Sequence, residues 1–277
     1  MAKRPQLSDA ARPATFEVEA YNERGEMTPT SIAGEHALTL YLDKRELVTL
    51  MTLGHAPEAL AIGYLRNQRI VDSLEDIAAV QVDWETESAA ITTTKKIDLK
   101  KKTERRTVTT GCGQGTVYGD LMDEIEKVKL RDDVTLADAD LYALIEKVRR
   151  HETIYKQAGA VHGCALATRA GEILMFVEDV GRHNAVDAIA GFMWLEGIDG
   201  SDKVFYTTGR LTSEMVIKCA QMRIPFLVSR SGLTKMGHDI AERVGLTMVG
   251  RASGRHYLAF TGRHRLKRTA PRATEVA

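Results

Sequence analysis

One cysteine in a glycine-rich stretch is the first candidate for chemistry in this sequence. Cys112 has glycine on both sides within the run Thr109–Thr116, which reads TTGCGQGT. Glycine backbone turns freely and has no side chain to shield a neighbouring sulfur, so the run predicts an exposed loop thiol. The bases between Lys100 and Arg106 would favour the nucleophilic thiolate if the loop folds back toward them. The alternative is a glycine-rich turn with an incidental cysteine.

The other two cysteines fit an interior role. Cys164 lies in the apolar run Val161–Ala167 and Cys219 in the later part of an amphipathic helix, and buried cysteines behave as small apolar residues. His162 and Cys164 have an H-x-C spacing, but a zinc deaminase also needs H-x-E and P-C-x-x-C. Pro225 is followed by Phe-Leu-Val instead. The sequence therefore predicts no metal site.

A second candidate is the polar run Glu178–Asp187, which reads EDVGRHNAVD. We place it between the end of a strand and the start of a helix, where the backbone N–H groups of the helix and a neighbouring arginine favour an anion. Arg182 and His183 are the basic side chains of this run. The alternative is helix capping by Asn184 and ion pairing by Asp179 and Arg182.

Two later loops repeat this chemistry. Thr207–Glu214 contains Arg210, and Ser229–Thr234 contains Arg230; each combines an arginine with hydroxyl groups after a predicted strand. Three successive loops of this kind predict one pocket for a phosphate-bearing ligand. None is a Walker A or a G-x-G-x-x-G motif, so the glycines do not identify a nucleotide. The basic turn Gly250–His256 would add cations to that pocket or form a solvated hairpin.

The elements that position these loops differ between the two halves of the chain. The first half predicts a strand-rich region with one helix from Pro57 to about Gln68. A long helix is expected over Asp138–Gln157, and after it strands alternate with helices of about a dozen residues, which is typical of an α/β sheet with parallel crossovers. The expected strands are Thr15–Ala20, His36–Leu42, Ile77–Val82, Ala89–Thr94, Arg105–Thr109, Val161–Ala167, Ile173–Val177, Val204–Thr207, Ile224–Ser229, Leu246–Val249 and His256–Phe260, and the later helices are His183–Leu195, Thr212–Met222 and Thr234–Val244.

Composition excludes several classes of protein. The chain has 277 residues, of which 44% are hydrophobic, with 38 Lys and Arg against 38 Asp and Glu. These values describe a globular protein, and no apolar run approaches the roughly 20 residues that span a bilayer. We expect a cytoplasmic protein that binds neither membranes nor nucleic acid. The segments expected are a flexible tail (1–14), a strand-rich subdomain (15–110), the cysteine loop and linker (111–136), an α/β core (137–262) and a basic flexible tail (263–277).

The motifs together resemble one known family. TTGCGQGT, GAVHGCALA, EDVGRHNAVD, TTGRLTSEMVIKCA, IPFLVSRSGLT and GLTMVGRASGR occur in the order seen in the formate dehydrogenase accessory sulfurtransferase family (FdhD), over about Ala33 to Tyr257. The resemblance implies a cytoplasmic homodimer with a cytidine-deaminase-like core that lacks the zinc site. It also implies transfer of persulfide sulfur from a cysteine desulfurase to the molybdenum bis(molybdopterin guanine dinucleotide) cofactor of formate dehydrogenase.

The resemblance also assigns roles to residues of this chain. By motif, Cys112 carries the sulfur as a persulfide, and no metal is implied. The cofactor, as the bound substrate, is expected at the later loops. The residues expected to contact it are Arg251, Ala252, Ser253, Gly254, Arg255 and His256, with Arg182, His183 and Arg210 in the same pocket.

Two positions depart from the family pattern. Many relatives have C-x-x-C at the loop, whereas the third residue after Cys112 is Gly115, so sulfur would be accepted and donated by one thiol. Relatives often have an aromatic residue where Arg251 stands. A different class of function is therefore kept as the alternative, in which the protein is a non-catalytic binding chaperone for the guanine-dinucleotide cofactor and Cys112 is incidental.

Overall fold

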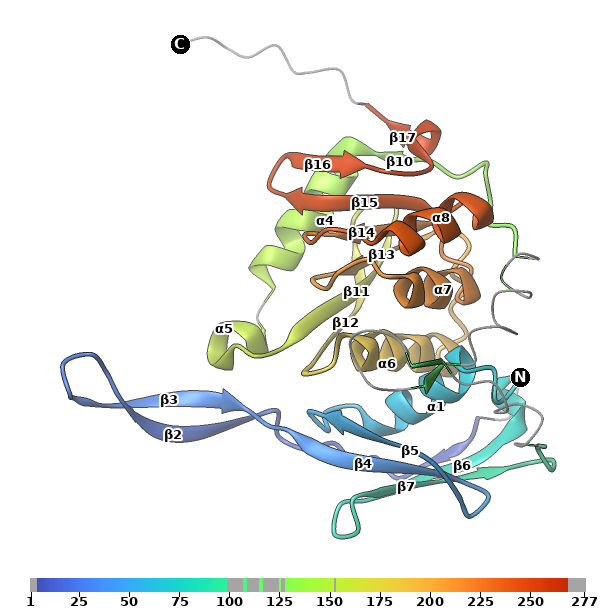
Figure 1. Cartoon of the computed structure of the whole chain (residues 1–277). Coiled ribbons are helices and arrows are strands. Elements are labelled where there is room, and N and C mark those ends of the chain that lie inside the picture. Colours follow the sequence, from blue (N-terminus) through green and yellow to red (C-terminus); the bar gives the residue numbers. More distant parts are fainter. Residues whose placement is uncertain are drawn as a thin grey trace.

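Two sheets separated by helices form the fold (Figure 1). The structure is a computed structural model that describes residues 4–98, 107–108, 115–116, 125, 128–151 and 153–268. The first sheet has the strand order β1-β6-β7-β4-β5. Its alternating strands bury one face against helix α1, as expected for a sheet covered on one side. The elements are β1 (Gln6–Leu7), β4 (His36–Leu42), β5 (Arg45–Thr52), α1 (Pro57–Asn67), η1 (Leu74–Asp76), β6 (Ile77–Asp83) and β7 (Ser88–Thr93).

A two-stranded hairpin extends from this first sheet (Figure 1). It consists of β2 (Thr15–Tyr21) and β3 (Met27–Ala33), which pair antiparallel. The sequence predicted β2 but not β3, and it also missed β5. Two further short strands, β8 (Thr107–Val108) and β9 (Gly115–Thr116), pair antiparallel; β8 comes just before the run Thr109–Thr116 and β9 is its last two residues.

The second sheet has six strands in the order β12-β11-β13-β14-β15-β16. Strands β13, β14 and β15 run parallel, as the alternation of strands and helices predicted, while β11, β12 and β16 make antiparallel pairs. The chain is therefore mixed α/β. The elements are β11 (His162–Thr168), β12 (Ile173–Asp179), α6 (Arg182–Leu195), β13 (Lys203–Thr207), α7 (Ser213–Gln221), β14 (Phe226–Ser229), α8 (Lys235–Val244), β15 (Thr247–Ser253) and β16 (His256–Ala259).

The two faces of this sheet are buried against different helices. Alternate residues of a strand point to opposite faces. Leu166, Phe205 and Leu227 accordingly belong to the core shared with α6, α7, α8 and α1, whereas Ala165 and Val204 pack with α4 (Asp138–Arg150) on the other side. Figure 1 shows the same arrangement, with α4 and the group α6–α8 on opposite faces.

Helices α1 and α6 hold the two halves of the chain together by an unusually close crossing. A Cβ atom placed on Gly63 of α1 would lie 1.6 Å from the carbonyl oxygen of Asp187, and one placed on Gly191 of α6 would lie 1.9 Å from that of Ala59. Only glycine permits this approach of the two backbones. The strand-rich half and the α/β half therefore share one continuous core.

The expected long helix over Asp138–Gln157 is wrong, because it divides in two. Helix α4 ends at Arg150, and a second helix, α5 (Ile154–Ala158), begins after Thr153. The Thr153 hydroxyl accepts a hydrogen bond from the backbone N–H of Lys156 (3.1 Å), which caps α5. The apolar residues of α4 with helical spacing are buried, as their pattern predicts: Leu141, Leu144, Ile145 and Val148.

Within the described residues, part of each expected flexible tail is paired in a short strand. At the amino end, β1 pairs in parallel with β6. At the carboxyl end, the 3-10 helix η2 (Arg263–Arg265) leads into β17 (Leu266–Lys267), which pairs in parallel with β10 (Leu136–Ala137). A two-residue strand carries no periodicity, so the sequence pattern did not reveal these pairings. Residues 269–277 of the expected tail lie outside the described residues.

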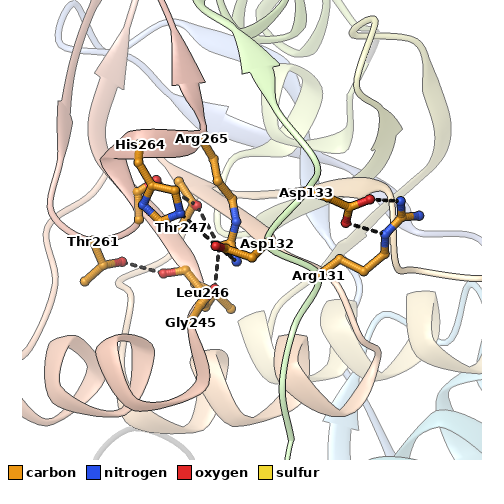
Figure 2. Close-up of polar contacts among 10 residues, drawn as sticks. Arg131, Asp132, Asp133, Gly245, Leu246, Thr247, Thr261, His264 and Arg265 are labelled. Atoms are coloured by element: carbon orange, nitrogen blue, oxygen red, sulfur yellow. Dashed lines mark hydrogen bonds and ion pairs between the residues drawn. The ribbon is translucent and has the colours of Figure 1, made fainter.

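Side chains reinforce the pairing at the carboxyl end (Figure 2). The Asp132 carboxylate lies 2.7 Å from His264 Nε2 and 2.9 Å from Arg265 Nη2. Arg265 is buried and also donates to the carbonyl oxygen of Gly245 and to Thr247 Oγ1. The segment that follows the cysteine run is thereby fastened to the end of the described chain. No helix in the described part of the chain is long and apolar enough to cross a membrane.

Candidate functional site

The topology of the second sheet brings all the predicted arginine loops to one edge. Strands β12, β13, β14 and β15 point the same way, so their carboxyl ends meet there, together with the first residues of β11 and β16. Such an edge is where open α/β sheets bind ligands. The residues that it gathers are Arg182 and His183 after β12, Arg210 after β13, Arg230 after β14, and Arg251–His256 at the β15–β16 turn.

Hydrogen bonds between neighbouring loops hold this edge together. Ser229 Oγ donates to the carbonyl oxygen of Gly209 (2.7 Å), which joins the loop after β14 to the loop after β13. The backbone N–H of Arg251 donates to the carbonyl oxygen of Ser231 (2.9 Å), which joins the loop after β14 to β15. The loops that carry the arginines are therefore fixed relative to one another.

Arg182 stands apart from the other arginines because its side chain is buried. It is 8% exposed, and among the described residues its Nε and Nη2 atoms have no hydrogen-bond partner. A Cβ atom on Gly209 would lie 2.8 Å from Arg182 Cδ, so the loop after β13 packs directly on the stem of this arginine. A buried guanidinium group without a partner is costly. A bound anion would satisfy it with charge-assisted hydrogen bonds.

His162, at the start of β11, lies close enough to three arginines for their charges to shift its pKa. Burial lowers its pKa, and the positive charges of Arg182, Arg230 and Arg210 lower it further. The imidazole is therefore neutral near pH 7. The sequence offered His162 only as half of an incomplete zinc motif, whereas the structure places it among the cations of the candidate site.

Two other polar residues of the run Glu178–Asp187, Asp179 and Asn184, face the protein interior. The Asp179 carboxylate accepts hydrogen bonds from Thr52 Oγ1 (2.5 Å) and from the backbone N–H of Leu53 (3.1 Å), both at the end of β5. Asn184 Nδ2 donates to Asp179 Oδ1 (2.9 Å) and to the carbonyl oxygen of Met51 (2.7 Å). Burial raises the pKa of Asp179 despite these donors. These residues join the first turn of α6 to the strand-rich half.

His183 also points inward. It is 1% exposed, and its Nε2 lies 3.3 Å from Glu214 Oε2 on α7. Burial lowers the pKa of His183 to about 3, although the Glu214 charge opposes this shift. The expectation that His183 contacts the cofactor stays a prediction. In this structure its ring lies between two helices.

A cavity of about 280 Å³ opens beside the arginines. Part of the predicted turn, Ala252 to Gly254, lines it, together with Arg230. Its apolar wall includes Phe176 and Tyr206, and the Arg230 guanidinium lies 5.4 Å from the ring centre of Tyr155 at the mouth. A cavity with aromatic walls and cations at its rim fits a planar ring that carries phosphate groups.

Glu178 is the acidic group of this cavity. Its carboxylate accepts hydrogen bonds from the backbone N–H groups of Ile154 (2.6 Å) and Tyr155 (3.2 Å), so it holds the start of α5. Burial raises its pKa. No sequence motif pointed to Tyr155 or Phe176, because neither lies in a polar loop.

The remaining predicted residues divide into exposed and undescribed ones. Arg210, Arg251, Arg255 and His256 have exposed side chains, and only Ala252 of the turn Arg251–His256 is buried. Arg251 has a φ angle of 52°, at an irregularity in the pairing of β15 with β16. Cys112 lies outside the described residues, so its role stays a prediction.

The other two cysteines are interior, as predicted. Cys164 and Cys219 are fully buried. Burial raises the pKa of Cys164 to about 12 and that of Cys219 well above its usual value, so both thiols stay protonated. Neither is suited to be a nucleophile at neutral pH.

The fold and the site define an α/β protein with arginine-bearing loops at the carboxyl ends of its strands. Comparison with known proteins narrows this class. The sequence model of the FdhD/NarQ family matches residues 33–267, and the chain belongs to this family.

Relatives and a solved structure agree with this membership. "Sulfur carrier protein FdhD" of Listeria monocytogenes is 30% identical over 241 residues, covering 86% of this chain and 92% of the relative. The protein of the same name from Wolinella succinogenes is 28% identical and covers 82% and 79%. A crystal structure described as a formate dehydrogenase accessory protein, from Desulfotalea psychrophila, matches with a TM-score of 0.74 at 26% identity, covering 92% of this chain and all of that chain.

Proposed function

We propose that this protein is a sulfurtransferase that serves formate dehydrogenase by accepting sulfur on Cys112 and delivering it to the molybdenum bis(molybdopterin guanine dinucleotide) cofactor. Its relatives are named as sulfur carriers, and the similar crystal structure is described as a formate dehydrogenase accessory protein. Of the three cysteines, Cys164 and Cys219 are buried with raised pKa values. Elimination therefore supports Cys112 as the carrier.

The step in which Cys112 accepts sulfur conserves atoms and electrons. The Cys112 thiolate attacks the terminal sulfur of a persulfide on a cysteine desulfurase. The sulfur–sulfur bond of the donor breaks, the donor cysteine leaves as a thiolate, and a new sulfur–sulfur bond forms on Cys112. No net oxidation takes place. With Gly115 at the third position after Cys112, a single thiol performs both acceptance and donation.

The observation that carries the binding half of the proposal is the unsatisfied guanidinium group of Arg182. Among the described residues its Nε and Nη2 atoms have no hydrogen-bond partner, and they lie at an edge that also presents Arg210 and Arg230. Phosphate groups of the cofactor fit this chemistry. A guanine end fits the aromatic cavity beside Ala252–Gly254. The finer expectations of a cytidine-deaminase-like core, a homodimer and a cytoplasmic location are part of the same proposal.

Mass spectrometry of the intact protein tests the proposal. Wild type and Cys112→Ala are incubated with a cysteine desulfurase and cysteine, and the masses are compared before and after a reductant. We expect a reducible gain of one sulfur on wild type alone. Cys112 would be refuted as the carrier if Cys112→Ala also gained sulfur, or if neither protein gained any.

The same proteins test the alternative that Gly115 favours, a cofactor chaperone without a transfer step. Titration calorimetry with GDP measures binding independently of the thiol. If wild type gains no sulfur but binds GDP, the protein is a chaperone. If it gains sulfur and binds GDP equally well with and without the Cys112 side chain, both halves of the sulfurtransferase proposal stand.

A further inference from the structure

Four buried ionisable side chains form two rungs between α6 and α7. His183 and Asp187 lie one turn apart on α6, and Glu214 and Lys218 lie one turn apart on α7. The first rung joins His183 Nε2 to Glu214 Oε2 at 3.3 Å, and the second joins Asp187 Oδ2 to Lys218 Nζ at 2.8 Å. All four side chains are 4% exposed or less.

The two rungs are connected to each other and to the strand-rich half. Lys218 Nζ also lies 3.6 Å from Glu214 Oε1. Asn67, the last residue of α1, donates to Asp187 Oδ1 at 2.7 Å. One buried polar network therefore touches α1, α6 and α7.

The position of the first rung connects it to the candidate site. His183 directly follows Arg182 in the first turn of α6, and Glu214 lies four residues after Arg210 in the first turn of α7. The contact between His183 and Glu214 thus fastens together the starts of the two helices whose preceding loops carry the anion-binding arginines.

We infer that Glu214 is a positioning residue, which holds the Arg182 and Arg210 loops in register through its contact with His183. This inference rests on the proposed function, in which those loops bind the phosphate groups of the cofactor. Buried polar and ionic contacts contribute little net stability, and their best-attested use is to specify one arrangement of the elements they join. Glu214 acts through His183 and does not itself touch the ligand.

The charge of the network makes Glu214 the residue to change. With both carboxylates ionised and the imidazole neutral, the four side chains carry one more negative than positive charge. Removing the Glu214 charge leaves the Asp187–Lys218 pair balanced. Variants at Glu214 are therefore expected to fold, whereas loss of Lys218 would leave a buried carboxylate without its cation.

The experiment compares Glu214→Ala with Glu214→Gln, which keeps the length and a hydrogen-bonding oxygen. The control is Glu172→Ala, which breaks an exposed ion pair with Lys147 (2.5 Å) between α4 and the β11–β12 turn. GDP affinity is measured by titration calorimetry. Amide hydrogen exchange of residues 180–182 and 209–212 is measured without ligand.

We expect Glu214→Ala to bind GDP at least 10-fold more weakly than wild type, which is about 1.4 kcal/mol, and to exchange faster in both loops. Glu214→Gln is expected within about 3-fold of wild type in affinity, about 0.65 kcal/mol, and the control is expected to match wild type. Wild-type GDP affinity in folded Glu214→Ala would overturn the inference.

The exchange measurement separates this inference from the proposed function. If wild type binds no GDP but both loops exchange faster in Glu214→Ala than in Glu214→Gln, the positioning role stands and the proposed cofactor binding fails. If exchange in the two loops is unchanged in Glu214→Ala, the positioning role fails whatever the calorimetry gives.

Discussion

Replacing Arg182 by methionine is expected to stabilise the ligand-free protein while it weakens binding of an anionic ligand. Methionine keeps most of the length of the side chain but has no N–H groups. In wild type the buried Nε and Nη2 atoms of Arg182 have no hydrogen-bond partner among the described residues. An unsatisfied buried donor costs about 1–3 kcal/mol, so removing the guanidinium group is expected to raise the free energy of unfolding.

The change in stability and the change in GDP affinity can be measured separately. A gain of ~1–3 kcal/mol in the free energy of unfolding raises Tm by roughly 2–10 °C in a chain of this size. Loss of one charge-assisted hydrogen bond to phosphate, ~1.5–3 kcal/mol, weakens GDP binding roughly 10- to 150-fold. The assay is scanning calorimetry after dialysis into a buffer without multivalent anions, followed by titration with GDP.

Arg265→Met is the matched control, because Arg265 is also buried but has partners for its Nη1 and Nη2 atoms. Its guanidinium group holds Gly245, Thr247 and Asp132 in the contacts of Figure 2. This variant is expected to melt below wild type, since the carbonyl oxygen of Gly245 loses its donor. If Arg182→Met also melts below wild type without ligand, the guanidinium group has a structural role and the reasoning is refuted.

Three further predictions concern the packing, the pH dependence and the thiols. Gly63→Ala is expected to lower the free energy of unfolding by about 3 kcal/mol in urea titrations, because its Cβ would lie 1.6 Å from the Asp187 carbonyl oxygen; Gly232→Ala, with nothing within 4 Å, should stay within ~0.5 kcal/mol. The pKa of His183 is lowered to about 3, so between about pH 6.5 and 3 the unfolded state binds one more proton than the folded state. The free energy of unfolding therefore falls as pH falls through that window. Urea unfolding curves of His183→Gln should show a shallower fall with pH, and a fall as steep as in wild type would contradict this. Iodoacetamide at pH 8 should leave Cys164 and Cys219 unmodified until urea unfolds the protein, and peptide mapping that finds either labelled in the native state would contradict their raised pKa values.

The fold could be predicted from the sequence wherever one local period decided it. The i, i+3, i+7 spacing of Leu141, Leu144 and Val148 predicted the buried face of α4, and the alternation of strands and helices predicted the parallel part of the second sheet. The division between α4 and α5 could not be predicted in this way. It depends on the Glu178 carboxylate, which lies on β12 and accepts from the first backbone N–H groups of α5.

The candidate site could be predicted as a set of loops but not as a set of side chains. Strand direction brings the loops together, and that direction follows from the order of the elements. The direction of each polar side chain depends on distant partners. Asp179 and Asn184 face inward because the end of β5 presents Thr52 and two backbone groups to them, and no pattern in the sequence indicated β5.

The run Glu178–Asp187 therefore has two roles at the start of α6: its carboxylates hold the helix in place, and its arginine presents N–H groups that are unsatisfied within the described part of the chain. Asp179 and Asp187 are satisfied by protein groups from the strand-rich half and from α7, and they fix the first turn of α6 from both sides. Arg182, between them, is buried by the same packing but has unsatisfied N–H groups among the described residues. The free energy stored in that arrangement is available to a ligand that supplies the missing acceptors, and we expect this to be how the edge favours an anion over solvent.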